Sequence, residues 1–269
     1  MMSSRLRPSL PRRLRSLLLA ASVLPALAGA APAALPVTVE GQVAHPGPQS
    51  LPAGARLAQA LEPAAPLPSA YLLGAALLRE RERSAQLRLK AGLSFDLQQW
   101  QAGPDTALAQ AATALLAQLQ ALPVTGRVVP QSLELRWLQV SAQDNRPLAA
   151  GDRLILPARP RQVQVVGAVV QACTLAHAPL RTARDYLSDC PRLPAADRDR
   201  VYVIQPDGRV FEHGIALWNR EDALTLAPGA RLYVPLPARA TRALDPQFNA
   251  EYARFLATQV PGDGQEARP

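Results

Sequence analysis

The chain has 269 residues, of which 48% are hydrophobic and 19% charged, so a wholly disordered protein is excluded. Its formal net charge is +8, but five arginines and no acidic residue lie within residues 1–30. The remainder is only mildly basic, at +3, which gives no indication of a surface that binds nucleic acid.

Residues 1–30 have the pattern of a secretory signal peptide. A basic segment precedes the apolar run 17–24, and Ala28-Gly29-Ala30 fits the small-residue cleavage rule. A membrane-spanning helix is the alternative, but the run is shorter than the ~20 residues that a span needs. We therefore expect an exported protein with no integral membrane segment in the mature chain.

Two internal repeats organise the mature chain. Residues 37–61 align without gaps with residues 163–187, and LAAGDRLILP at 148–157 aligns with LAPGARLYVP at 226–235. The second match is the stronger, with six of ten positions identical. Because both matches occur in the same order, a duplication explains them better than a coincidence of composition.

Each copy reads as two strands, a short helix and further strands that end in an apolar strand after a glycine turn. This order predicts an α+β protein of two tandem β-grasp domains, at residues 36–157 and 161–237. The two matches have different offsets, so the first copy carries an insertion.

The insertion, residues 69–122, is expected to be a helical hairpin. Its first helix would start at Ser69 as N-cap, and its second would span residues 105–122 between a Gly-Pro break and Pro123. The second helix has an apolar stripe at helical spacing, made of Leu108, Ala112, Leu115, Leu119 and Leu122. The stripe either packs the hairpin and its own domain, which we favour, or forms a projecting arm that binds a partner.

A second amphipathic helix is expected at residues 245–260, starting at Asp245-Pro246. Its apolar face contains Phe248, Tyr252 and Phe255. We expect it to dock on one of the domains, and insertion into a partner or membrane is the alternative. Residues 262–269 are expected to be disordered.

The sequence offers little catalytic chemistry. His45, His177 and His213 lie outside any metal-binding spacing, so we expect no metal and no cofactor. Asp197 and Asp199 could act as an acid–base pair, but their spacing in a polar loop favours a turn. We therefore expect no catalytic residues.

Cys173 and Cys190 are the only cysteines. Export places them in an oxidising compartment, where an even number of cysteines favours a disulfide. Two buried free thiols are the alternative.

Three polar or aromatic residues are candidates for ligand binding. Arg127 follows a glycine where the helical insertion ends, and it could present its guanidinium group into a groove. Trp218 and Asn219 could contact a saccharide by ring stacking and amide hydrogen bonds. Structural roles are the alternatives: a salt bridge for Arg127 and a core position for Trp218, and we favour both.

The second repeat, with its C-T-L, ADRDRVYVIQPDGRV, ALWNR and APGARLYVPLP segments, resembles the GfcC-type capsule biosynthesis proteins, as does T-G-R-V at 125–128. The resemblance covers essentially the whole mature chain. It implies a periplasmic protein with two β-grasp domains, kinship to the outer-membrane polysaccharide export proteins, and Arg127 as a candidate pocket residue.

We therefore expect a non-catalytic periplasmic accessory protein of capsule or exopolysaccharide export. Its expected partners are the outer-membrane polysaccharide export protein and the capsular or extracellular polysaccharide. The alternatives are an enzyme that trims or modifies the polysaccharide, using Asp197, Asp199 or Arg127, and a structural protein that assembles through the helix at 245–260.

Overall fold

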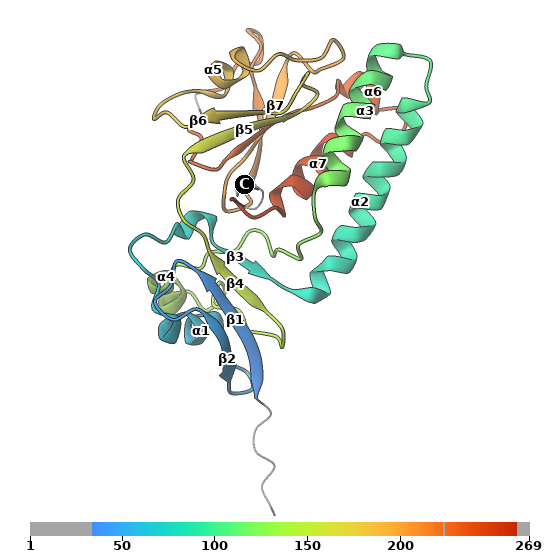
Figure 1. The fold of residues 1–269 in the computed structure, drawn as a ribbon. Helices are drawn as coiled ribbons and strands as arrows, with labels where there is room; N and C mark the ends of the chain where they lie inside the picture. Colours follow the sequence, from blue (N-terminus) through green and yellow to red (C-terminus); the bar gives the residue numbers. More distant parts are fainter. Residues whose placement is uncertain (1–33, 223, 263–269) are drawn as a thin grey trace, which may run out of the picture. The chain divides into compact units, whose positions relative to one another are not determined.

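The computed structural model describes residues 34–222 and 224–262. The predicted signal peptide at 1–30 lies outside the described residues, as does all but Gly262 of the tail predicted at 262–269. The described chain is an α+β protein with two separate β-sheets (Figure 1). None of its helices is long and apolar enough to cross a membrane.

The first sheet has four strands in the order β2-β1-β4-β3. These are β1 Leu35–Gly41, β2 Gly47–Leu51, β3 Ala76–Leu78 and β4 Arg153–Leu156. Alternate residues of β1 are buried, as a half-buried strand requires. They form one hydrophobic core with helices α1 (Leu57–Ala64) and α4 (Leu135–Val140).

The second sheet has five strands in the order β6-β5-β9-β7-β8. Their bounds are β5 Gln162–Gly167, β6 Cys173–Ala176, β7 Arg200–Ile204, β8 Val210–Gly214 and β9 Arg231–Val234. The short helix α5 spans Ala183–Ser188, and Thr182 caps its first turn.

The two sheets have the same arrangement of their central strands. In each, the first strand pairs antiparallel with the second and parallel with the last: β1 with β2 and β4, and β5 with β6 and β9. Gly41 lies opposite Leu156, and Gly167 lies opposite Val234. At both glycines φ is positive, and an added Cβ would lie 2.2 or 2.3 Å from the partner's carbonyl oxygen, so only glycine fits.

The insertion contains two helices, but the first starts later than predicted. Helix α2 spans Glu80–Gln101 and α3 spans Thr106–Ala121, with Asp105 accepting a hydrogen bond from the Leu108 N–H. Ser69 is therefore not the N-cap. The intervening chain forms a 3-10 turn, η1 at Leu72–Gly74, and then β3, whose three apolar residues are all buried against β4.

The helices α2 and α3 pack on each other, as we favoured, but their buried residues also pack with the second sheet and not, as expected, with the domain that carries the insertion. The buried residues of α2 and α3 belong to the same core as β5, β7 and β9. Gln118 of α3 also pairs with both the N–H and the carbonyl of Gly167, at 2.8 and 2.9 Å. The stripe is apolar because it closes this core.

The C-terminal helix is also part of this core. After the short α6 (Ala238–Thr241), α7 spans Phe248–Ala257, three residues later than predicted, because Asp245 caps a turn through the Gln247 N–H. The Tyr252 ring stacks on Tyr233 at 4.8 Å between centroids, and Phe248 meets Trp100 of α2 edge-on at 4.6 Å. The aromatic face is therefore buried within the chain and is not free for assembly.

Candidate functional site

Arg127 lies at the junction of the hairpin, α7 and the turn between β7 and β8. It follows Gly126, whose φ is +75° and whose added Cβ would lie 2.6 Å from the Arg79 carbonyl oxygen. The guanidinium group donates hydrogen bonds to the carbonyl oxygens of Pro206, Ala257 and Gln259.

Arg127 does not present its guanidinium group into an open groove, which was the less favoured of its predicted roles. The residue is only 3% exposed, and its donors are directed at backbone carbonyls. Its fork of N–H groups fastens the end of α7 and the β7–β8 turn to the segment that follows the hairpin. The sequence could not reveal this role, because the acceptors are backbone atoms distant in the sequence.

Trp218 and Asn219 have separate roles. Trp218 is 72% exposed in the turn after β8, so the core position that we favoured for it is wrong. The Asn219 carboxamide accepts from the Ala216 N–H and donates to the Asp199 carbonyl, both at 3.0 Å. Asn219 therefore stabilises the turn, while Trp218 keeps its ring in solvent.

The two candidate acidic residues form a turn. The Asp197 carboxylate accepts hydrogen bonds from the N–H groups of Asp199 and Arg200, at 2.8 and 3.0 Å. This is the local backbone contact that aspartate makes in loops. The turn that we favoured over an acid–base pair is the arrangement present.

Cys173 and Cys190 form the predicted disulfide. It joins β6 to the chain just after α5, so it ties the edge strand of the second sheet to the helix that covers it. Cys190 is fully buried, which places the bond at the edge of the core.

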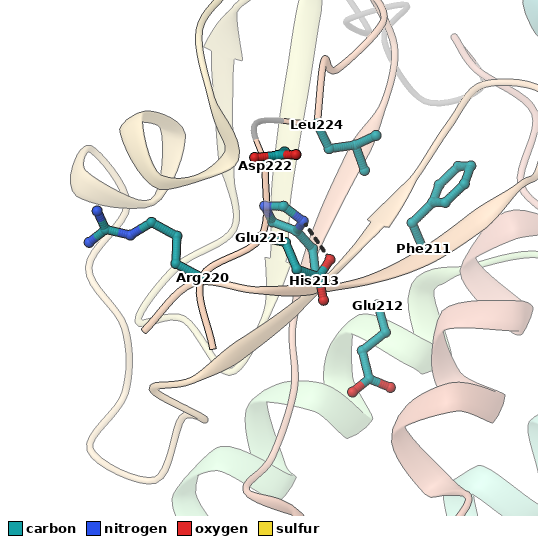
Figure 2. A pocket seen from close by; sticks show the side chains of 7 residues that line it. All are labelled: Phe211, Glu212, His213, Arg220, Glu221, Asp222 and Leu224. Atoms are coloured by element: carbon teal, nitrogen blue, oxygen red, sulfur yellow. Dashed lines mark ion pairs between the residues drawn. The ribbon is translucent and has the colours of Figure 1, made fainter. Parts of the chain in front are cut away.

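A pocket of about 630 Å³ lies beside β8 (Figure 2). His213 and Glu221 line it side by side, with 3.3 Å between Nδ1 and Oε2, while Arg220 extends away from this pair. The seven lining residues include the carboxylates of Glu212, Glu221 and Asp222 and no serine, threonine or cysteine. Within residues 34–222 and 224–262 no group of three potential ligands is placed to hold a metal ion.

A second cavity, of about 340 Å³, lies where α4 and the β7–β8 turn approach each other. We call it the Trp137 groove, after the half-exposed indole of α4 that lines it. Its polar lining residues are Gln131, Ser132, Glu134, Asp144, Asp207 and Arg209. No motif in the sequence singled out this surface, because its residues come from three distant segments.

The fold and these sites describe an α+β protein with one disulfide and several small polar surface cavities. Comparison with known families matches residues 31–157 to the N-terminal domain of the capsule biosynthesis protein GfcC and residues 171–261 to its C-terminal domain. The chain therefore belongs to the GfcC capsule biosynthesis family, as its sequence predicts. It is also 30% identical to the uncharacterized protein YjbG of Escherichia coli K12, over 72% of this chain and 79% of that protein.

Proposed function

We propose that the protein is a non-catalytic accessory of capsule or exopolysaccharide assembly and export. It would act in the periplasm after removal of residues 1–30, and bind the exported polysaccharide, the outer-membrane polysaccharide export protein, or both. The observation that carries this proposal is the family match to both parts of the chain. The disulfide supports an oxidising compartment.

We also propose that residues 36–157 and 161–237 are two β-grasp domains derived by duplication. The shared pairing of β1 with β4 and of β5 with β9 supports this, as do the paired glycines, Gly41 and Gly167. The helical hairpin is then an insertion into the first domain that packs on the second. Such a hairpin would hold the two copies in contact.

Binding is favoured over chemistry because the residues considered for catalysis are engaged elsewhere. Arg127 donates to backbone carbonyls, and Asp197 accepts from backbone N–H groups. Assembly through the C-terminal helix is disfavoured because Phe248, Tyr252 and Phe255 are completely buried.

Deletion of the gene in the organism that encodes it tests the proposed function. We expect the deletion strain to lose surface polysaccharide, measured as uronic acid and total hexose on washed cells. The full chain should restore it, and a chain lacking residues 1–30 should not. Wild-type amounts of surface polysaccharide in the deletion strain would contradict the proposal.

A further inference from the structure

We propose that the Trp137 groove is a binding subsite for an uncharged pyranose segment of a polysaccharide. This inference rests on the proposed function and deepens it, because it names the site and the class of sugar. The groove has a volume of about 340 Å³, which lies within the range of small-ligand sites.

The Trp137 indole is held in place. Its side chain is half exposed, and its Nε1–H donates to the Asp144 carboxylate at 2.6 Å. The same carboxylate oxygen accepts the Ser141 hydroxyl at 2.8 Å. An indole fixed at its polar edge offers its apolar face to a ligand, and the C–H face of a pyranose is the complementary surface.

The groove is rich in hydrogen-bond acceptors. The carboxylates of Glu134, Asp144 and Asp207 line it, and each ionised carboxylate can accept several hydroxyl donors. Gln131 also lines it: the side chain is 6% exposed and donates to the carbonyls of Ser132 and Asp144, while its Oε1 has no hydrogen-bond partner. The Gln131 side chain therefore joins two backbone segments of the groove wall.

The charge of the groove selects against acidic sugars. Three carboxylates line the groove together with one cation, Arg209, whose Nε lies 3.4 Å from Asp207, and Arg146 acts on Asp144 from outside the lining. Hydrogen bonds from Ser141 and Trp137 lower the pKa of Asp144, so this carboxylate stays ionised. A uronate or phosphate group would be repelled, whereas neutral hydroxyls would be bound.

A neighbouring cavity of about 380 Å³ lies beside the groove. Pro130 and Arg209 line both cavities, and the second adds the partly exposed Phe211. The junction is tightly packed, because an added Cβ on Gly208 would lie 2.5 Å from Val129 Cγ1. One aromatic ring in each of two adjacent cavities, Trp137 and Phe211, suits an extended chain of several sugar units.

Oligosaccharides released from the organism's own exopolysaccharide, separated into uncharged and uronate-containing fractions, test this inference by calorimetry. We expect the uncharged fraction to bind and Trp137→Ala to weaken its binding about tenfold or more. The matched variant Phe95→Ala removes an aromatic ring of similar exposure, 57%, from α2, outside the groove, and should bind as the wild type does. Denaturant unfolding of both variants checks that they are folded.

Glu134→Gln provides a second readout that does not remove the ring. Loss of this exposed carboxylate should increase binding of the uronate-containing fraction relative to the uncharged one. The inference is overturned if the uncharged fraction does not bind, if Trp137→Ala binds it normally, or if Glu134→Gln leaves the preference unchanged. The proposed function is judged separately, by the surface polysaccharide of the deletion strain.

Discussion

Two buried arginines explain much of how this chain is held together. Arg127 donates to carbonyls near the end of α7 and in the β7–β8 turn. Arg79, at the start of α2, reaches the Asp152 carboxylate with two nitrogens, at 2.9 and 2.6 Å. Both side chains are at least nine-tenths buried, so each depends on its acceptors to offset the loss of hydration.

Replacing Arg79 should destabilise the fold strongly. Arg79→Met leaves the Asp152 carboxylate buried without its cation, and we expect the free energy of unfolding to fall by about 3–5 kcal/mol in urea at pH 7. The matched control is Arg81→Met, because Arg81 is 70% exposed and pairs with Glu82 in solvent. That variant should lose at most about 1 kcal/mol. Equal small losses in both variants would show that the buried pair adds little.

Asp96 of α2 is a site where a charge opposes folding. Partial burial raises its pKa, and the negative charges of Asp245 and Glu251 raise it further. The folded state therefore favours the protonated Asp96 carboxyl. The stability that protonation of Asp96 contributes is lost as the pH rises through the pKa of Asp96 in the folded state.

Asp96→Asn should consequently stabilise the protein at pH 7 by a few tenths of a kcal/mol. The gain should vanish near pH 3, below the ordinary pKa of 3.8, where the native carboxyl is protonated in both states. Unfolding curves at the two pH values measure the difference. A gain of the same size at both values would exclude charge repulsion as its cause.

At the scale of elements, α7 links the hairpin to the second sheet. Phe248 lies edge-on to Trp100 of α2, and Tyr252 stacks on Tyr233 of β9. The hydroxyl of Tyr252 also donates to the Leu115 carbonyl of α3 at 3.0 Å. These contacts make α7 the centre of one cooperative core and not an appendage to it.

Removing one ring from this core should therefore be costly. Phe248→Ala is expected to lower the free energy of unfolding by about 3–5 kcal/mol, because the ring is fully buried and leaves a cavity. Phe95 of α2 is 57% exposed, so Phe95→Ala should change the free energy of unfolding by about 0.5 kcal/mol or less. If Phe248→Ala were as mild as Phe95→Ala, α7 would not be part of the core.

For the whole molecule, the features predicted best from the sequence are those that a repeat or a short local pattern indicates. The second helix of the hairpin follows from a local pattern, and the disulfide follows from export and an even number of cysteines. The α2 start could not be predicted, since a proline-free apolar run does not distinguish a helix from the buried strand β3.

The candidate site was harder to predict than the fold. Trp218 and Arg127 were singled out for their residue types, yet their exposure depends on tertiary contacts: Arg127 is buried and Trp218 is exposed. Trp137 carries no distinctive motif around it. It becomes a candidate only because the β7–β8 turn, through Asp207 and Arg209, completes the groove that it lines.

We propose that this chain acts on an exported polysaccharide by binding and not by chemistry. The most direct test is to incubate the protein, without residues 1–30, with the polysaccharide that its organism exports, and to follow the molar mass of the glycan by light scattering. We predict that the molar mass of the dissociated glycan is unchanged after prolonged incubation. A progressive fall in that mass, dependent on the protein, would contradict the claim and identify an enzyme.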